Sequence, residues 1–540
     1  GKAFKKVITW KKFSTKLDYL EAVDDEVELL KACKKVIKDF SPNIITGYYT
    51  DGFDFPYLKA RADKHDVNLN LGLDNSSLIV RSRGGNSEAK ITGMLHLDVF
   101  KFVRNIIRTS LKTDSFSLDA VSEELLGHKK HDVNLDELAH IWDEEPDKLD
   151  DFCAYNLHDA HLVFKLCEKL FPSMIEFTKL LGLPTSDIIR MRFSRLVESY
   201  ILKRTLEYNV IAPNRPGREE IEQRSEETYQ GGFVFEPKPG LYEDVVVFDF
   251  RSLYPTIISA HNIGPESLNC SCCGENKVPG KEEYWFCEKE KKFIPLVLER
   301  LILRRVSLKR LIKEAKEKND PTKLLEARSY ALKTLANSFY GYLGFFGARW
   351  YCLECARSTT AYARNYIQTT INKAEEKGFE VIYGDTDSMF MMLGEKHLSE
   401  AKEFMNEINF DLPGHMELEF EGYFPRGIFV ALKGSDRGAK KRYALIDEQS
   451  KIKITGFETV RRNTSLLAKE AQKKVLTLIL NDEAEQALQY IKETIAELKA
   501  GNTPLDKLII KTQITRELEK YTSIGPHVYI AKKLVEKGQK

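Results

Sequence analysis

Two strand-like segments decide how this chain folds: EDVVVFDF at residues 243–250 and FEVIYGDTDSMFMM at residues 379–392. Each is an apolar run typical of a buried strand, and each carries carboxylates. Asp385 and Asp387 lie two residues apart, where we expect a turn between two strands. Side chains at positions i and i+2 of an extended chain point to the same side, so the spacing predicts that both carboxylates converge. Asp249 ends the first apolar run.

These acids predict a metal site. Two carboxylates held close together repel each other unless cations lie between them, and unpaired buried charges are costly. A DTD sequence also occurs in surface turns, but the apolar flanks VIY and MFMM indicate a buried hairpin. Asp249 and Asp387 together could hold two Mg²⁺ ions about 3.5–4 Å apart, the arrangement used in phosphoryl transfer.

A helical block of about residues 296–370 separates the two segments. On helical spacing Lys333 and Asn337 share one face, as do Arg305 and Lys309. Two helices presenting these groups would form a cationic slot for a triphosphate. An ordinary solvated charged face is the alternative, and the position of the block between metal-binding strands favours the slot.

Size and composition limit the class of protein to which these motifs can belong. With 540 residues, of which 42% are hydrophobic, the chain can form several cores, and its net charge of +1 does not point to or away from a polyanionic partner. No stretch reaches the roughly 20 apolar residues of a membrane span. The first residues, GKAFKKVITWKKF, lack a signal-peptide run. We expect a cytoplasmic protein without a membrane partner.

Nine cysteines are unevenly distributed. Cys270, Cys272, Cys273 and Cys287 cluster within residues 269–287, where a structural Zn²⁺, a disulfide or unligated thiols are all open. Cys352 and Cys355 form a CxxC without a redox context, so we expect structural thiols or a bridge there.

The motifs, taken together, resemble a known family. DFRSLYPTII (249–258), KTLANSFYG (333–341) and YGDTDS (383–388) are similar in order and separation to the three polymerase motifs of archaeal-type family B DNA polymerases. The resemblance implies an α/β multidomain fold: a ribonuclease H-like 3′-5′ exonuclease domain and a right-hand polymerase with palm, fingers and partial thumb. The corresponding segments are 1–171 (exonuclease-like), 172–213 (helical linker), 214–294 and 346–437 (palm), 295–345 (fingers) and 438–540 (partial thumb).

The resemblance also implies roles for individual residues in templated DNA synthesis from deoxynucleoside triphosphates on primer-template DNA. The metal site contains Asp249, Phe250 and Asp387, with Asp385 beside them. The incoming nucleotide is contacted by Ser252, Leu253, Tyr254, Arg305, Lys309, Lys333, Asn337 and Tyr340. Tyr254 matches the steric gate that leaves no room for a ribose 2′-hydroxyl, the alternative being a core aromatic.

Two further elements match the parts of the family that hold DNA. Lys441 and Tyr443 in KKRYA (440–444) resemble the KxY element that grips the primer-template. Tyr229, Gly231 and Gly232 in YQGGF resemble the element that links the exonuclease and polymerase halves. Asn463 and Thr464 depart from the acid and tryptophan of many relatives, which affects the expected thumb contacts only.

The first 170 residues alternate strand-like runs (KKVITW, NIITGY, GMLHLDVF) with amphipathic helices and resemble the exonuclease domain. Asp54 in GFDFPYL and Tyr155 and Asp159 in YNLHDA match its second and third motifs; alone, Asp54 could be a helix cap or loop acid. The DxE pair of the first motif does not precede KKVITW, so we expect weak or absent proofreading. We therefore expect a chain incomplete at both ends, either a piece of a longer polypeptide or the large part of a split polymerase. A sliding clamp or a second polypeptide completing the fold would then be a partner.

Two other readings compete with DNA synthesis. A noncatalytic polymerase-like subunit would bind DNA without extending it, and a nuclease would act through Asp54 and Asp159. The presence of Asp249, Asp385 and Asp387 favours the polymerase, because a scaffold has no use for the metal-binding acids.

Overall fold

The computed structural model describes residues 4–83, 86–113, 115–128, 133, 137–461, 463–510, 512, 514, 516–521 and 524–537. The chain divides into two compact units. The first contains Gly1–Glu226 and Leu296–Cys352, and the second contains Glu227–Pro295 and Leu353–Lys540. In the described part of the chain, no helix combines the length and the apolar character needed to cross a bilayer.

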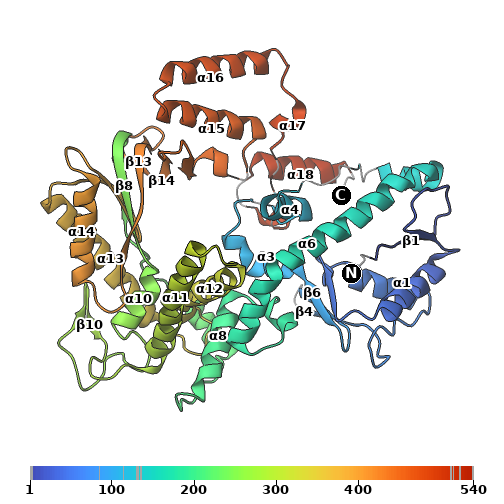
Figure 1. The fold of residues 1–540 in the computed structure, drawn as a ribbon, viewed down its shortest axis with the longest axis horizontal. Helices are drawn as coiled ribbons and strands as arrows, with labels where there is room; N and C mark the ends of the chain where they lie inside the picture. Colours follow the sequence, from blue (N-terminus) through green and yellow to red (C-terminus); the bar gives the residue numbers. More distant parts are fainter. Residues whose placement is uncertain are drawn as a thin grey trace. The chain divides into compact units, whose positions relative to one another are not determined.

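The second unit is built on one seven-stranded sheet in which all neighbouring strands are antiparallel. Its strands, in spatial order, are β15 (Ile452–Thr455), β14 (Gly438–Ile446), β13 (Leu418–Ala431), β8 (Gly240–Phe250), β12 (Ser388–Met392), β11 (Glu380–Asp385) and β7 (Val234–Phe235). Three of these strands, β8, β13 and β14, are labelled in Figure 1. Strand β8 is central, and its residues Val245, Val246, Val247 and Phe248 are completely buried. A strand covered on both faces needs the continuous apolar run that the sequence has there.

Alternate residues of β8 face different cores. Val245 and Val247 pack into an aromatic cluster with Tyr383, Phe390 and Phe429. Phe248 contacts Phe404 of α14 (Leu398–Asp411), with ring centroids 6.4 Å apart. The outer strands bury a third cluster against α15 (Leu466–Leu480).

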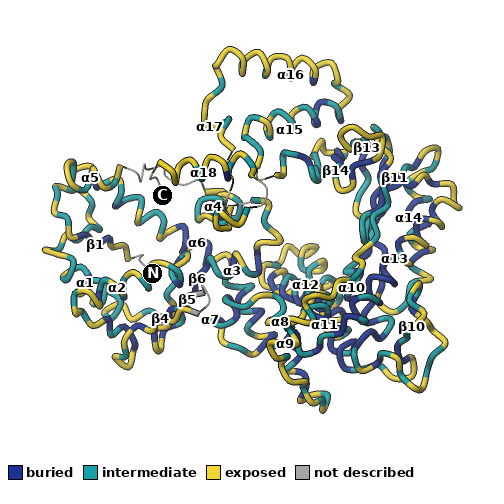
Figure 2. The backbone as a smooth tube through the Cα atoms, turned by 180° about the vertical axis from the view of Figure 1, so that it is seen from behind, coloured by how far each residue is buried: buried dark blue, intermediate teal, exposed yellow. Residues whose placement is uncertain are grey.

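The second unit contains further helices, short strands and turns. They are α10 (Leu253–Ala260), β9 (Lys277–Val278), β10 (Lys281–Trp285), α13 (Leu353–Glu376), α16 (Ala484–Lys499), α17 (Leu505–Leu508) and α18 (Pro526–Glu536), with 3₁₀ turns at Glu458–Val460 and Leu518–Lys520. Helix α16 packs against α15 but is exposed along most of its length (Figure 2).

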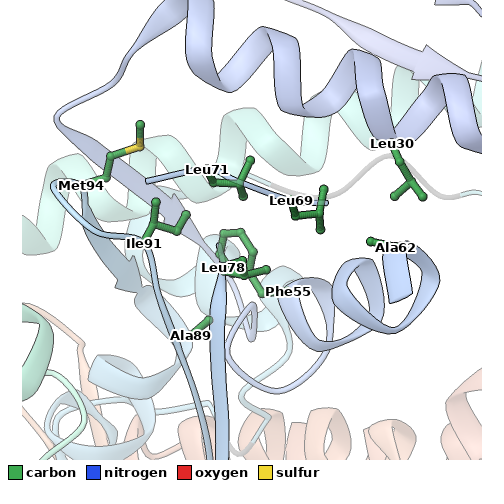
Figure 3. Close-up of a cluster of buried hydrophobic side chains, with 9 residues drawn as sticks. All are labelled: Leu30, Phe55, Ala62, Leu69, Leu71, Leu78, Ala89, Ile91 and Met94. Carbon is green, nitrogen blue, oxygen red and sulfur yellow. The ribbon is translucent and has the colours of Figure 1, made fainter. Parts of the chain in front are cut away.

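The first unit has an N-terminal α/β region. Among its described residues the strands form three two-stranded sheets: β1 (Val7–Thr9) with β2 (Leu20–Ala22), β3 (Ile44–Gly47) with β6 (Leu95–Asp98), and β4 (Ile79–Arg83) with β5 (Asn86–Lys90). Its helices are α1 (Glu26–Phe40), α2 (Asp54–Lys64), α3 (Val99–Asn105), α4 (Leu118–Leu126), α5 (Leu138–Glu144) and α6 (Leu149–Leu181), with 3₁₀ turns at Ile107–Thr109 and Pro146–Lys148. Figure 3 shows part of its core, where Leu30 of α1 and Phe55 and Ala62 of α2 cluster with Leu69, Leu71, Leu78, Ala89, Ile91 and Met94. The predicted alternation of strands and helices is confirmed.

The helical pattern of SDIIRMRFSRLVESYILKRTLEYN (186–209) predicts one long helix, and this prediction is wrong. Helix α7 (Thr185–Ile188) ends before Arg190, and α8 (Phe193–Thr205) begins after it. In the break, the Arg190 guanidinium donates to both carboxylate oxygens of buried Asp51, from Nε at 2.7 Å and from Nη2 at 2.9 Å. A buried carboxylate needs such a partner, and this tertiary pairing accompanies the interruption of the local helical pattern.

The predicted helical block is confirmed and consists of α11 (Phe293–Glu317), α12 (Lys323–Leu343) and the later α13. In the first unit, α12 packs on α6 and α8. Arg328 of α12 donates to Glu176 of α6 at 2.8 Å, and Tyr342 donates to Glu198 of α8 at 3.1 Å. Helix α9 (Arg218–Glu226) completes this unit. Helix α6 runs without a break across the predicted 171/172 boundary, and the six-part division of the chain stays a prediction.

Candidate active site

Asp249 and Asp387 are brought together by strand pairing. Asp249 lies opposite Ser388 of β12 and opposite Glu419 of β13, and the backbone N–H of Phe250 donates to the carbonyl oxygen of Asp387 at 2.8 Å. Burial raises the pKa of Asp249 to about 7, and the negative charge of Asp387 adds to the rise. Burial likewise raises the pKa of Asp387, with the charge of Asp385 contributing. The acids from the two sequence segments therefore interact, as the sequence predicts.

The DTD turn differs from the predicted geometry. Thr386 lies in the left-handed region with φ of 60°, and the N–H of Asp387 donates to the carbonyl oxygen of Asp385 at 2.6 Å. The segment is thus a tight turn, in which side chains do not alternate as they do along an extended strand. The turn instead keeps both acids at the end of the β11–β12 hairpin, whose residues Ile382, Tyr383, Met389 and Phe390 are buried.

Lys441 contacts the acidic turn. Its Nζ lies 3.3 Å from Oδ1 of Asp385, and its backbone N–H donates to the Tyr383 hydroxyl at 3.0 Å. Lys441 has a φ of 59°, and the neighbouring strand approaches so closely that a Cβ at Gly456 would collide with the Lys441 carbonyl. Gly456 therefore permits the backbone path that turns Lys441 toward the acids.

Tyr254 and the YQGGF element also lie at these acids. Burial raises the pKa of Tyr254 to about 12, and the charge of Asp387 contributes. A Cβ placed on Gly232 would lie 3.0 Å from the Tyr254 hydroxyl and 2.9 Å from Cγ2 of Thr386. Gly232 is thus the contact point between this element and the site, whereas a Cβ on Gly231 would meet nothing within 4 Å.

The backbone between Asp249 and Tyr254 turns sharply. Ser252 has a φ of 49° and precedes α10, and Leu253 is the buried first residue of that helix. The end of β8 thereby leads directly into α10, and Tyr254 lies in the first turn of this helix, near Asp387 and Asp385.

Tyr443 has a different environment from Lys441. Its ring is buried between Phe429, with centroids 5.4 Å apart, and Phe390, with centroids 5.0 Å apart. A direct contact of Tyr443 with DNA stays a prediction; within the protein it is part of the aromatic core beneath Lys441.

Sequence reasoning missed three acids at the start of β13: Glu417, which immediately precedes the strand, and Glu419 and Glu421 within it. Glu417 and Glu419 form ion pairs with Arg251, with Nε of Arg251 donating to Glu419 at 2.7 Å. Glu421 lies in a β-bulge between Phe420 and Gly422, pairs with Lys453 at 2.6 Å, and helps raise the pKa of Asp249 and Asp387. A bulge can re-aim a side chain toward a site. The alternating acids of ELEFEG were the available signal.

The predicted triphosphate-binding residues all belong to the first unit. Arg305 and Lys309 are half-buried on α11, Lys333 and Asn337 are exposed one turn apart on α12, and Tyr340 is half-buried on the same helix. The predicted helical spacing within each pair is present in the structure.

The predicted exonuclease residues lie on two helices of the first unit. Asp54 is the exposed first residue of α2, while Tyr155 and Asp159 are one turn apart on α6, which packs on β3. Sequence reasoning missed Asp51, which binds Arg190, and buried Asp98, which accepts N–H donors from Tyr49 and Asp51 at 2.8 and 3.1 Å. Burial raises the pKa of Asp98 to about 6. These two acids fix the loop that precedes Asp54.

The two groups of cysteines have different environments. The sulfur atoms of Cys270, Cys272, Cys273 and Cys287 lie within 4.8 Å of one another and form a cluster that could hold a metal ion. Cys352 and Cys355 are buried, as structural thiols would be.

Neighbouring carboxylates at the end of an antiparallel sheet repel each other and are suited to bind divalent cations. The fold and the site together define the class of protein as an enzyme that catalyses metal-dependent phosphoryl transfer. Residues 183–540 match the family model of "DNA polymerase family B", and residues 2–121 match that of "DNA polymerase family B, exonuclease domain". The chain belongs to DNA polymerase family B, and its activity class is DNA-directed DNA polymerase.

Curated relatives and a solved structure agree with this membership. A DNA polymerase of Pyrococcus glycovorans is 41% identical over 99% of this chain and 68% of its own length, and one of Thermococcus gorgonarius is 40% identical with the same coverage. The structure of the family B DNA polymerase from the hyperthermophilic archaeon Pyrobaculum calidifontis matches with a TM-score of 0.69 and 31% identity, over 96% of this chain and 66% of that one. The chain thus spans about two thirds of the length of these relatives.

Proposed function

We propose that this chain extends a DNA primer on a DNA template by two-metal phosphoryl transfer at Asp249 and Asp387. The observation that carries the proposal is the pairing of β8 with β12, which places Asp249 opposite Ser388 and therefore beside Asp387 in the turn just before β12. Burial raises the pKa of Asp249 to about 7, and the charge of Asp387 adds to the rise. Such coupling fits a site that divalent cations neutralise. Oxygen donors of this kind are the ligands that Mg²⁺ prefers.

Asp249 and Asp387 would hold Mg²⁺. The backbone of Phe250 lies beside them, because its N–H donates a hydrogen bond to the carbonyl oxygen of Asp387. Bound Mg²⁺ lowers the pKa of an attacking hydroxyl and stabilises the leaving oxygen of an in-line displacement. Asp385 has a different task, since it pairs with Lys441. Lys441 thereby places a positive charge next to the acidic turn, suited to a phosphate of the primer-template.

Tyr254 selects the sugar in this proposal. Its place in the first turn of α10, with its hydroxyl against Gly232 and its pKa raised partly by Asp387, supports a position beside the nucleotide that the metals hold. A rigid ring there excludes a 2′-hydroxyl by steric overlap. Ser252 and Leu253 would contact the same nucleotide through the turn that precedes α10.

The triphosphate is held by cationic residues of the fingers segment. Arg305, Lys309 and Lys333 offer charge-assisted hydrogen bonds to phosphate oxygens, and Asn337 adds a neutral donor. Tyr340 would pack near the nascent base pair. Tyr229, Gly231 and Gly232 would contact the template through the exposed YQGGF segment.

Primer extension with Asp387→Ala tests the assignment. We expect at least a thousandfold loss, on the order of what electrostatic and metal-binding groups contribute, because one side of the metal site is removed. Asp436→Ala, an exposed acid between β13 and β14, is the matched control. Unchanged synthesis in Asp387→Ala would refute the site, and an inactive parent protein that still binds primer-template would support the noncatalytic subunit instead.

Exonuclease activity is a second candidate, because residues 2–121 match the family's exonuclease domain. Asp54, Tyr155 and Asp159 are the proposed residues, and weak activity of this chain stays a prediction. Degradation of a 3′ end without nucleotides, compared between the parent and Asp54→Ala, measures it. Binding of a sliding clamp or of a second polypeptide also stays a prediction, and sedimentation of the chain with an added clamp would test it.

A further inference from the structure

The four clustered thiols lie on both sides of one loop in the second unit. Cys270, Cys272 and Cys273 follow α10, and Cys287 comes two residues after β10. Their four sulfur atoms all lie within 4.8 Å of one another. Sγ of Cys272 is 3.7 Å from Sγ of Cys273 and also 3.7 Å from Sγ of Cys287. The cluster thus has one sulfur equally close to two others.

These distances fit a shared ion. Four thiolates about 2.3 Å from a tetrahedral Zn²⁺ are separated from one another by about 3.8 Å. A disulfide instead brings two sulfurs to about 2.05 Å and leaves the other thiols out of the bond. The two separations of 3.7 Å match the tetrahedral edge.

Hydrogen bonds from the surrounding protein hold the backbone around the four sulfur atoms in place. The backbone N–H of Glu288 donates to Sγ of Cys273 at 3.4 Å, as amides do for metal-bound thiolates. The Trp285 indole donates to the carbonyl of Cys270 at 3.0 Å, which ties the two arms of the loop together. The N–H of Cys287 donates to the carbonyl of Ser267 at 3.0 Å.

Asn262 fixes the segment that follows Cys287. Its Nδ2 donates to the carbonyls of Cys287 at 2.6 Å and Glu290 at 2.8 Å, and its Oδ1 accepts from the N–H of Lys292 at 2.8 Å. Asn262 itself is buried. The backbone that carries the last thiol is therefore held in place from the end of α10.

We propose that Cys270, Cys272, Cys273 and Cys287 bind one Zn²⁺ ion as a closed, structural Cys₄ site. Soft thiolates select Zn²⁺ over Mg²⁺, so this site is distinct in chemistry from the carboxylate site. Binding converts the thiols to thiolates and releases their protons to solvent. All four positions are filled by protein, so the ion takes no part in the reaction.

The site would brace α13. Strands β9 and β10 pack on α13, and α13 also packs on α10 and β11, the strand that ends at Asp385. A loop fixed by the ion would therefore hold α13 in place, and α13 in turn packs on the β11–β12 hairpin that carries Asp385 and Asp387. Loss of the ion should lower thermal stability before it alters the chemistry of the carboxylates.

Metal analysis of the full-length chain tests the proposal. Protein purified under reducing conditions should contain one zinc per chain, and Co²⁺ substitution should give the intense visible bands of tetrahedral thiolate coordination. Cys272→Ser and Cys287→Ser should each lose most of the zinc, measured with a chromogenic chelator. Cys33→Ser, a half-buried thiol on α1, is the control and should keep it.

The outcomes separate this site from the polymerase proposal, because they are read as metal content and do not depend on DNA synthesis. Zinc-free protein that also fails to bind Co²⁺ would overturn the proposal. Full zinc content in Cys272→Ser would overturn it as well. Should a serine variant fold poorly, alkylation of the parent protein gives the answer: protection of all four thiols by Zn²⁺ supports the site, and a disulfide between two of them refutes it.

Discussion

The pH dependence of divalent metal binding tests the coupling of Asp249 and Asp387. Burial and the charge of Asp387 raise the pKa of Asp249 to about 7 in the metal-free protein. A protonated carboxyl cannot bind a metal, so affinity should increase as pH rises through that value. With a pKa of about 7, Asp249 is roughly one tenth ionised at pH 6 and nine tenths ionised at pH 8. Apparent affinity should therefore be about tenfold weaker at pH 6 than at pH 8.

The assay is titration with Mn²⁺, a paramagnetic substitute for Mg²⁺, with free Mn²⁺ measured by electron paramagnetic resonance at pH 6, 7 and 8. An Asp54→Ala, Asp159→Ala background removes the proposed exonuclease ligands. Asp387→Asn should bind Mn²⁺ more weakly at every pH and should also flatten the dependence, because the neighbouring charge is gone and the pKa of Asp249 falls. Asp436→Asn is the control and should behave as the background does.

Two results would contradict this reasoning. Affinity that does not change between pH 6 and pH 8 would mean that Asp249 is not a ligand or is ionised throughout. A dependence that stays the same in Asp387→Asn would mean that the two acids do not interact.

Three other changes have expected outcomes. Tyr254→Ala should reduce discrimination against ribonucleotides by at least about tenfold, measured as the ratio of kcat/KM for a ribonucleotide and its deoxynucleotide; unchanged discrimination would argue against a steric gate. Gly232→Val should lower kcat/KM for deoxynucleotides by about ten- to a hundredfold, because a Cβ there presses on Tyr254 and Thr386. Gly217→Ala, where a Cβ meets nothing within 4 Å, should leave it unchanged, and equal losses in both would refute the packing argument. His261 stacks on Tyr362 at 3.8 Å, and burial lowers its pKa to about 4. The unfolded state therefore binds a proton that the folded state excludes, and stability should fall as pH decreases from about 6.5 toward 4. His261→Gln should have a shallower dependence of Tm on pH in that range, and an unchanged slope would show that His261 is not responsible.

The sequence predicted the central parts of the site because they are local patterns. A buried strand needs a continuous apolar run, and VVVF and the flanks of YGDTDS provide one. Asp249 directly follows VVVF, and Asp387 lies in the turn between VIY and MFMM, so their convergence could be expected once both strands were assigned to one sheet. The CxCC cluster was found in the same way, by close spacing.

The features that were missed depend on contacts between distant residues. Glu421 is 172 positions from Asp249 in sequence, and only the pairing of β13 with β8 and the bulge at Phe420–Gly422 place it near the acids. Arg190 and Asp51 are 139 positions apart, and their ion pair lies where a helical pattern predicted continuity. Periodicity along the chain carries no information on either contact.

The central place of β8 makes the position of Asp249 depend on a ladder of backbone hydrogen bonds on both sides. Loss or gain of a single residue within residues 240–244, with the start of the strand held in register, would turn the carboxylate to the opposite face of the sheet and at the same time remove Val245 and Val247 from the aromatic core. Length changes in this part of the strand should consequently abolish folding and DNA synthesis together.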